Sequence, residues 1–422
     1  MAKDLLITNA ALFSGCEPHA EPDHALWISD GLIRFAGPMT DLPTSIARRA
    51  TERQSDLTIV DAQGKFVMPG MTETHAHLSF SDASPFAIGE SSVEAATITA
   101  VNNASLMLRS GFTSAVSFGS THAIDVALRH AINSGQIEGP RLLAAGQDLG
   151  ATASNVDSEG ALSQIADGPW ELRKAVRQQR RLGVDIVKIF IDGEAINPTN
   201  PPGELAFTDE EVAAIVDEAQ RRHLRVACHA RSAAAVKQAV RAGVELIGHA
   251  NFLDDEAIDV LAQVKDKVFI GPAIAWEINY LAKCASLGID RQTVIDQGYQ
   301  AEIEATQRSV EKLREADIRL VVGGDYGISI APHGTYAQDL EFFVDYFDMS
   351  PAEALRCATK NGGLAADPTG GRGTLEEGKL GDALIINGDP LANIKVLQDH
   401  QRIEVVKGGR LINPASSTSM RH

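Results

Sequence analysis

The chain has 422 residues, of which 44% are hydrophobic and 22% are charged, and its formal net charge is −18. This composition is typical of a large globular domain with an appendage, and an acidic balance without a Lys/Arg cluster excludes a nucleic-acid partner. No apolar run is long enough to span a bilayer, and the start MAKDLLITNA lacks the apolar stretch of a signal peptide. The four cysteines form no CxxC pair, so we expect reduced thiols, a cytoplasmic location and no membrane partner.

Short strands and turn signals occupy both ends of the chain. The first part contains LLITNAALFSG, ALWISDGLIRFAG and LTIVDAQGKFVMPG, and the last part contains GDALIINGDP and IEVVKGGRLIN with a turn at Gly408-Gly409. Neither end alone has enough strands for a stable sheet. We therefore expect residues 1–68 and 369–422 to form one small composite β-sandwich.

Residues 69–368 alternate between short apolar strands and helices. The apolar runs are TSAVSF (113–118), RLLAA (141–145), DIVKIF (185–190), RVAC (225–228), ELIG (245–248), KVFIG (267–271) and RLVVGG (319–324). A strand before His75 makes eight. Capping boxes at Thr208–Glu211 and Ser350–Glu353 begin two helices, and Gly243 ends another. Such alternation predicts an α/β fold, a (β/α)8 TIM barrel over residues 69–368.

The active site of such a barrel lies at the carboxyl ends of its strands. The first strand ends Thr74-His75-Ala76-His77. Strand side chains alternate between two faces, so His75 and His77 point the same way. A single histidine is more often a core or surface residue, whereas for this pair a metal site is as good an interpretation as a structural one.

A lysine, Lys188, lies in the middle of the apolar strand DIVKIFID. A buried lysine is nearly always paired, and one interpretation is an ion pair, for instance with Asp192. The other is that CO2 has carbamylated the amine, which turns it into an anionic ligand with two oxygens that can bridge two cations.

Three further strands end on metal-binding residue types. His229 and His249 follow consecutive strands, and Asp325 follows Gly-Gly after the last strand. By itself an Asp after two glycines is usually a turn residue or a helix N-cap. Together, four imidazoles, one lysine and one carboxylate are more ligands than a single tetrahedral zinc ion needs, which favours two metals.

These motifs resemble the amidohydrolase superfamily. The likeness rests on PGMTETHAH, the strand lysine, the histidine spacing, Asp325 and GKLGDALIINGDPL, and it extends through GFTSAVSFG, EGPRLLAAG, HGTYAQDLEFFV and ATKNGG. Within the superfamily the chain is similar to the imidazolonepropionase-like branch. That branch includes Xaa-Pro dipeptidases and carboxypeptidase-type enzymes that hydrolyse ochratoxin A.

The resemblance implies a centre of two divalent ions, Zn²⁺ by preference, around a hydroxide. The buried ion would bind His75, His77, carbamylated Lys188 and Asp325, and the second would bind Lys188, His229 and His249. Asp325 would act as general base and then as general acid. The implied reaction is hydrolysis of a small peptide-like amide, such as a dipeptide, an N-acyl amino acid or ochratoxin A, with release of an apolar or aromatic C-terminal amino acid. The resemblance also implies a homo-oligomer such as an octamer.

The substrate contacts are less well defined by the sequence. Ser117-Phe118 stands where the branch often has Arg-Asp, ATASNV replaces a frequent Gly-Gly-His, and Arg231 replaces a frequent His or Tyr. Arg231 is a candidate to bind a substrate carboxylate or to pair with a structural acid. His333 and Trp276 are candidates to line the pocket, or else a loop histidine and a packing aromatic residue.

Several other functions fit parts of this pattern. A lactonase, a cyclic amidase or a phosphotriesterase would use the same two-metal site. A deaminase of the superfamily would use one metal and would normally lack Lys188. A non-catalytic scaffold on the same barrel would be expected to have lost ligands, and here every ligand is present.

Overall fold

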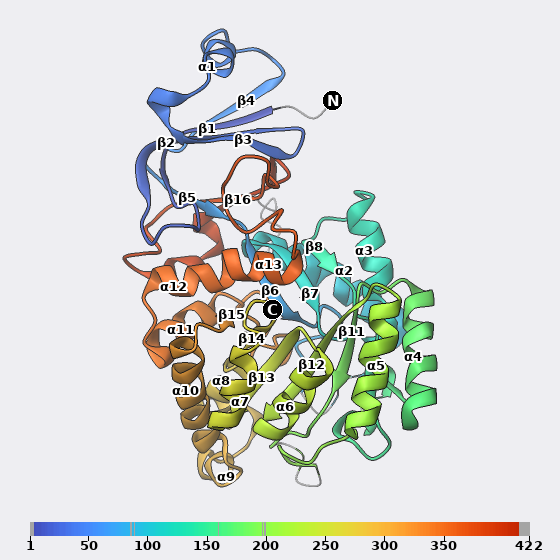
Figure 1. The fold of residues 1–422 in the computed structure, drawn as a ribbon. Coiled ribbons are helices and arrows are strands. Elements are labelled where there is room, and N and C mark those ends of the chain that lie inside the picture. Colours follow the sequence, from blue (N-terminus) through green and yellow to red (C-terminus); the bar gives the residue numbers. More distant parts are fainter. Residues whose placement is uncertain are drawn as a thin grey trace. The chain divides into compact units, whose positions relative to one another are not determined.

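The computed structural model describes residues 4–412 apart from positions 85, 86, 88, 159, 196, 198 and 199. It divides into two compact units (Figure 1). The first comprises Met1–Thr72, Met107–Ser114 and Met349–His422, and the second comprises Glu73–Leu106 and Ala115–Asp348. These units are groups of residues in mutual contact, so the domain boundaries given above stay predictions.

The first unit is built on one mixed sheet with the strand order β18-β17-β16-β5-β1-β2-β3, in which β4 also pairs with β1. Its strands are β1 (Asp4–Leu12), β2 (Glu21–Ser29), β3 (Leu32–Pro38), β4 (Leu57–Asp61), β5 (Phe66–Pro69), β16 (Ala383–Ile386), β17 (Ile403–Lys407) and β18 (Arg410–Ile412). β16 runs antiparallel to β5, with Ile386 opposite Phe66 and Ala383 opposite Pro69. This pairing joins the two ends of the chain and confirms the predicted composite β-domain.

Apolar side chains are buried on both faces of this sheet, in one cluster around Ile7, Ile28 and Ile385 and another around Leu6 and Ile46. The helices of this unit are α1 (Thr44–Thr51), α12 (Pro351–Arg356) and α13 (Gly362–Ala366), with the short turns η1 (Met39–Asp41), η8 (Ile394–Gln398) and η9 (His400–Arg402) and the π-helical segment η7 (Cys357–Asn361). The predicted capping box begins α12: the Ser350 hydroxyl accepts a hydrogen bond from the Glu353 N–H, and the Glu353 carboxylate accepts one from the Ser350 N–H.

The second unit contains most of the barrel. The eight barrel strands are β6 (Met71–Ala76), β7 (Phe112–Ser117), β8 (Arg141–Leu143), β11 (Ile186–Phe190), β12 (Arg225–Ser232), β13 (Leu246–Phe252), β14 (Phe269–Gly271) and β15 (Arg319–Leu320), and the first residues of β6 and β7 are grouped with the first unit. The strands from β11 to β15 pair in parallel and in sequence order. The Ile186 N–H donates to the Ala144 carbonyl beyond β8, and the Thr74 N–H donates to the Val322 carbonyl beyond β15. These bonds close the ring, which confirms the predicted eight-stranded barrel.

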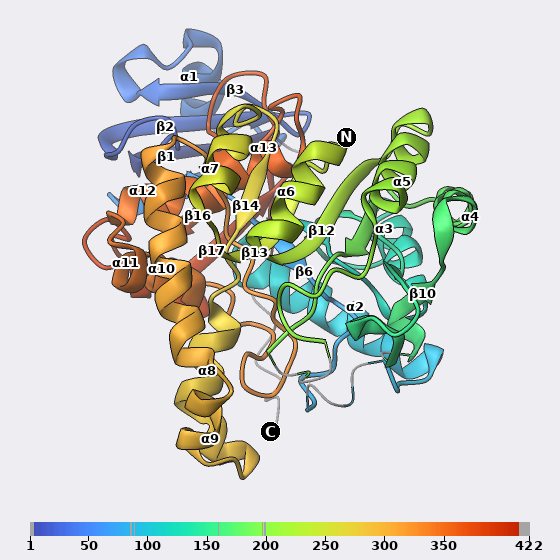
Figure 2. The same cartoon turned by 60° about the horizontal axis from the view of Figure 1, so that its bottom comes forward.

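Helices surround the strands of this unit, and α4, α5 and α6 lie outside β11 and β12 in both views (Figures 1 and 2). The helices are α2 (Val93–Arg109), α3 (Asp125–Asn133), α4 (Gly168–Leu182), α5 (Asp209–Arg221), α6 (Ala233–Ala242), α7 (Asp255–Ala262), α8 (Ala275–Lys283), α9 (Arg291–Asp296), α10 (Tyr299–Glu315) and α11 (Gln338–Phe347). Two short strands, β9 (Asp148–Gly150) and β10 (Ser163–Ile165), extend the sheet beside β11. The short turns are η3 (Thr121–Ala123), η4 (Asn155–Ser158), η5 (Gly160–Leu162) and η6 (Cys284–Leu287). The predicted capping box begins α5, and Gly243 ends α6 with φ +96°. Among the described residues, no helix combines the length and the apolar character needed to cross a bilayer.

Candidate metal centre

The carboxyl ends of five barrel strands bring six polar side chains together. They are His75 on β6 and His77 just beyond it, Lys188 on β11, His229 on β12, His249 on β13 and Asp325 beyond β15. We call this group the histidine cluster. The ring centroids of His75 lie 5.2 Å from those of both His77 and His249, and those of His229 and His249 are 4.2 Å apart. Parallel strands that end at one rim of a barrel produce this convergence.

One half of the cluster is organised around Asp325. Its Oδ1 lies 3.2 Å from His77 Nε2 and 3.6 Å from His75 Nε2. Two ligands of one tetrahedral zinc ion are roughly 3.4 Å apart, given metal–ligand bonds of about 2.1 Å. The spacing between these atoms is therefore that of a shared cation.

The tautomer of His77 supports this interpretation. Its Nδ1 lies 3.1 Å from the Gly119 carbonyl, which accepts only, so Nδ1 carries the proton. In the neutral ring Nε2 then presents a lone pair to the Asp325 carboxylate. Two acceptors in such proximity need a cation between them, and a backbone carbonyl that fixes the tautomer is the usual support of a metal-binding histidine.

Several buried nitrogen atoms of the cluster have no hydrogen-bond partner among the described residues. They are Nδ1 of His75, Nε2 of His229, and both ring nitrogens of His249. Each of these residues is at most 3% exposed. A buried polar atom without a partner costs about 1–3 kcal/mol, and native proteins rarely leave several together. Their chemistry, imidazole nitrogen with carboxylate oxygen, fits a divalent transition-metal ion.

Burial also sets the protonation of the cluster. It lowers the pKa of His75, His229 and His249 well below their ordinary value, so the rings are neutral and keep a lone pair for a ligand. Burial raises the pKa of Asp325, but the neighbouring His75 and His77 outweigh it and hold that pKa well below its usual range. His75, His229 and His249 therefore present neutral imidazoles beside an ionised Asp325, the states that bind metals.

The backbone is strained at two members of the cluster. His249 has φ +79° and Asp325 has φ +59°, a left-handed region that costs non-glycine residues about 1–3 kcal/mol each. Gly323 and Gly248 let the chain approach His75, since a Cβ at Gly323 would lie 2.9 Å from the His75 Cβ. Strain of this kind persists where the surrounding structure holds a functional geometry.

Lys188 is 1% exposed and lies against the histidines. Its Nζ is 3.4 Å from the Phe118 carbonyl oxygen, which accepts its hydrogen bond, and 3.5 Å from Asp148 Oδ2. The rings of Phe118 and Phe190 lie 5.0 and 5.4 Å from the same nitrogen. Phe118, one of the residues that departs from the branch pattern, thus packs on Lys188 and also on the His75 ring at 4.2 Å.

The structure corrects the suggested ion pair between Lys188 and Asp192. β11 ends at Phe190, so Asp192 no longer follows the alternation of the strand. Its carboxylate accepts hydrogen bonds from the backbone N–H groups of Arg231, Ser232 and Gly203. The acid beside Lys188 is Asp148 on β9, which the sequence analysis did not identify.

Arg231 lies in a buried group of acids. Its Nη1 donates to Glu302 Oε1 at 2.6 Å and to Glu277 Oε1 at 2.7 Å, and its Nη2 lies 3.4 Å from Glu194 Oε1. We call these four residues the arginine cluster. Arg231 is 2% exposed, so the structure shows it paired with acids of the protein, and a contact with substrate stays a prediction.

The other two predicted substrate contacts are also buried. His333 Nε2 donates to the Phe80 carbonyl at 3.1 Å, which leaves Nδ1 to accept from the Tyr336 hydroxyl at 2.7 Å. Trp276 is 8% exposed and stacks on Tyr280, with their ring centroids 5.8 Å apart. For both residues a direct contact with substrate stays a prediction.

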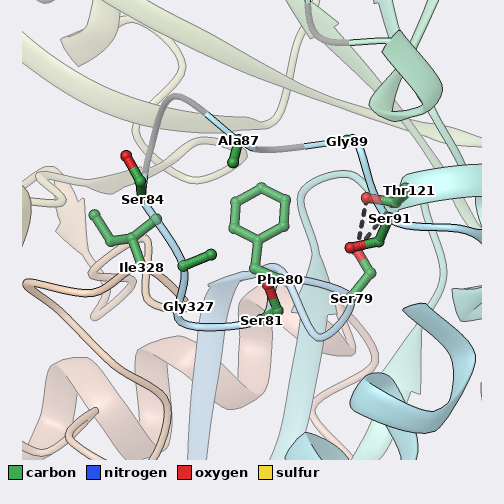
Figure 3. A pocket seen from close by; sticks show the side chains of 11 residues that line it. Ser79, Phe80, Ser81, Ser84, Ala87, Gly89, Ser91, Thr121, Gly327 and Ile328 are labelled. Carbon is green, nitrogen blue, oxygen red and sulfur yellow. Dashed lines mark hydrogen bonds between the residues drawn. The ribbon is translucent and has the colours of Figure 1, made fainter. Parts of the chain in front are cut away.

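A pocket adjoins the histidine cluster through Phe80. Its ring stacks on His77, with centroids 4.4 Å apart and planes 5° from parallel. Figure 3 shows Phe80 in the pocket lining, between Ile328 on one side and Ser79 and Thr121 on the other. The pocket thus combines an apolar ring with hydroxyl groups beside a predicted metal ligand.

The chain matches the model of the amidohydrolase family over residues 66–412. It is 29% identical over 416 residues to ochratoxinase from Aspergillus niger, which covers 92% of this chain and 82% of that protein. The crystal structure of the A. niger enzyme superposes with a TM-score of 0.85 at 26% identity, over 97% of this chain and 95% of that one. A solved Xaa-Pro dipeptidase with bound methionine in its active site superposes with a TM-score of 0.83 at 25% identity, over 98% of this chain and 100% of that one.

These matches confirm the family and the kind of enzyme that the motifs predicted. The family match extends over most of the chain and contains every member of the histidine cluster. The chain belongs to the amidohydrolase family and is a hydrolase that acts on amide bonds.

Proposed function

We propose that this amidohydrolase cleaves a peptide-like amide and releases a C-terminal amino acid with an apolar or aromatic side chain. The observation that carries the proposal is the histidine cluster, where neutral imidazoles with unpartnered nitrogens face an ionised Asp325 at the carboxyl rim of the barrel. The choice of substrate is supported by the similarity to ochratoxinase and to a Xaa-Pro dipeptidase.

In this proposal His75, His77 and Asp325 hold one divalent ion, and His229 and His249 hold a second. Lys188, once carbamylated by CO2, would offer two carbamate oxygens to the same centre. When bound, two such ions supply Lewis acidity and an ionised water near neutral pH. Zn²⁺ suits the set of nitrogen and oxygen donors.

The proton transfers fall to Asp325. Its side chain is 21% exposed, so a substrate can reach it, and its low pKa keeps it ionised before the reaction. As the water oxygen bonds to the carbonyl carbon, the Asp325 carboxylate accepts the water proton, and it returns that proton to the amine nitrogen as the C–N bond breaks. The carboxylate is thus first a base and then an acid, which cleaves the C–N bond without a net change in protonation.

The pocket beside His77 is our candidate for the apolar part of the substrate. Phe80 offers a ring face to an aromatic or aliphatic group, while Ser79 and Thr121 offer hydroxyls to a polar one. His333 fixes this wall, because its hydrogen bond to the Phe80 carbonyl holds the backbone there. In this arrangement His333 acts as a positioning residue.

The test is release of free amino acid from N-acyl-phenylalanine, a panel of dipeptides, and ochratoxin A. Each substrate is assayed with native enzyme, with enzyme dialysed against a chelator, and after Zn²⁺ is added back. We expect release of phenylalanine or a similar residue, loss of release on chelation, and recovery with Zn²⁺.

Two outcomes would contradict the proposal. Amide cleavage that survives complete removal of metal would overturn the two-metal mechanism. An enzyme that holds two metals and yet cleaves none of these amides would overturn the substrate class. Lactones, cyclic amides and phosphotriesters would then be assayed, because the same centre serves all three.

A further inference from the structure

A carboxylate outside the predicted ligand set lies beside the second half of the histidine cluster. Glu194 follows β11 in the chain, and its Oε1 is 3.6 Å from His229 Nδ1. One ligand atom from each of Glu194, His229 and His249 can be chosen so that all three lie within 4.8 Å of one another. The same criterion is met by His75, His249 and Asp325, which belong to the predicted centre.

The distance between Glu194 and His229 has a chemical meaning. At 3.6 Å the two atoms are too far apart for a hydrogen bond. This distance shows that the Glu194 carboxylate lies beside the His229 ring, whose unpartnered nitrogen is Nε2.

Unpartnered nitrogens point to the same place. Both ring nitrogens of His249 and the Nε2 of His229 find no hydrogen-bond partner among the described residues, and each ring is 1% exposed. A neutral imidazole must bury one N–H and one lone pair, so a ring with neither satisfied lacks a ligand. Glu194 therefore lies next to two histidines whose unpartnered nitrogens can bind a metal ion.

The charges of the arginine cluster favour a cation as that ligand. Arg231 donates its short hydrogen bonds to Glu277 and Glu302, at 2.7 and 2.6 Å, and reaches Glu194 only at 3.4 Å. Two buried carboxylates and the half-buried carboxylate of Glu194 thus share one guanidinium group. Buried charge without compensation is costly, and a divalent ion beside Glu194 would offset the excess.

We propose that Glu194 is a ligand of the second metal ion, together with His229 and His249. This inference rests on the proposed two-metal centre and adds a residue to it. The second ion then has two nitrogens and a carboxylate of its own and does not depend on Lys188 alone. The guanidinium of Arg231 orients the Glu194 carboxylate, and the hydrogen bonds to Glu277 and Glu302 position Arg231.

The experiment is metal analysis of the purified full-length chain. Wild type, Glu194→Gln and Glu194→Asp are loaded with Zn²⁺, dialysed against graded chelator and analysed for ions per chain. The matched control is Glu302→Gln, which removes a carboxylate from the same guanidinium and leaves Glu194 in place. Substitution with Co²⁺ adds a visible spectrum that depends on the ligands of the ion.

We expect Glu194→Gln to weaken binding of one ion by at least about 10–100-fold, the loss found when even a supporting residue of a metal site is removed. Its Co²⁺ bands should shift, Glu194→Asp should recover part of the affinity, and Glu302→Gln should retain both ions. Circular dichroism establishes that each variant is folded.

The assignment of Glu194 is overturned if Glu194→Gln retains both ions with wild-type affinity and Co²⁺ spectrum. It is also overturned if Glu302→Gln loses the same ion to the same extent, because Glu194 would then act only through the arginine cluster. A wild-type chain that binds fewer than two ions overturns the two-metal proposal together with this one. The two failures are therefore distinguishable.

Discussion

Two buried polar groups in the barrel unit differ in how their atoms are partnered. Between α4 and α5, Glu218 accepts hydrogen bonds from Arg177 Nε at 2.9 Å and Arg177 Nη2 at 3.0 Å, and a third at 2.9 Å from Arg222 Nε. Both of its oxygens are satisfied. In the histidine cluster, by contrast, several nitrogens have no partner among the described residues.

The difference separates structure from function. A carboxylate fully paired by arginines fixes two helices against each other and leaves nothing for a ligand. A group of neutral imidazoles that face an ionised carboxylate is complete only when something binds there. Both groups contain buried polar residues, so the functional site is distinguished by buried nitrogen atoms that have no hydrogen-bond partner among the described residues.

The largest effect is expected for Asp325→Asn. The substitution preserves shape and removes the charge, so we expect kcat/KM for the amide substrate to fall by at least about 10³-fold, within the range for loss of a general base. The stability of the metal-free protein should change little, since the printed side-chain contacts of Asp325 among the described residues are those to His75 and His77. Steady-state kinetics and thermal unfolding measure the two effects, and a variant with a near-native rate would remove Asp325 from the mechanism.

Removal of bound metal tests the same contrast through stability. Ions that bind only the folded chain stabilise it, by about 2.7 kcal/mol at a free concentration of 100 times Kd. We expect the chelated protein to stay folded but to melt at a lower temperature than the metal-loaded protein. Differential scanning calorimetry of both forms gives the shift, and equal melting temperatures would mean that no ion completes the cluster.

The smallest effect is expected for Glu218→Gln. Loss of its charged hydrogen bonds to Arg177 and Arg222 should destabilise the fold by about 1–3 kcal/mol. It should leave kcat/KM unchanged, because the residue lies between helices outside the barrel. Urea unfolding and kinetics on the same preparation check both statements. A loss of activity in the folded variant would contradict the purely structural role of Glu218.

The same variant has a defined pH dependence. Hydrogen bonds from Arg177, followed by those from Arg222, lower the pKa of Glu218 from its ordinary 4.5 to about 2. A lowered pKa means that the stabilisation is present above pH 4.5 and is lost as the pH falls from 4.5 towards 2. The stability difference between wild type and Glu218→Gln should therefore be constant near neutrality and shrink below pH 4.5. A difference that does not change with pH would contradict this assignment.

Much of the fold could be predicted because its signals are local. Seven of the eight barrel strands coincide with short apolar runs, and the capping boxes before α5 and α12 lie where their residues predict them. The composite sheet was predictable because neither end of the chain carries enough strands by itself. The cluster ligands were visible because each lies within or shortly after a barrel strand, Asp325 five residues beyond β15, so barrel topology brings them together.

The remaining site residues depend on contacts that no local pattern encodes. Arg231 meets Glu277 and Glu302 from two helices far along the chain, and Glu194 approaches His229 from an irregular loop. Asp148 reaches Lys188 from a short extra strand, and a Cβ on Gly119 would lie only 2.2 Å from its Oδ1. The sequence offered Asp192 as one ion-pair partner of Lys188, and the pair does not form because β11 ends two residues earlier and Asp192 binds backbone N–H groups.

The pairing of β5 with β16 also sets an order of events during synthesis. About 300 residues separate the two strands, and ribosomes add about 5–20 residues per second, so β5 waits about 15–60 s for its partner. For that time an apolar edge of the sheet is open to other chains, as unpaired edges favour aggregation. Chaperone demand should therefore be concentrated on the N-terminal strands of the nascent chain. A protein shortened before Ala383 would keep that edge open permanently, and its yield in the soluble fraction would report on it.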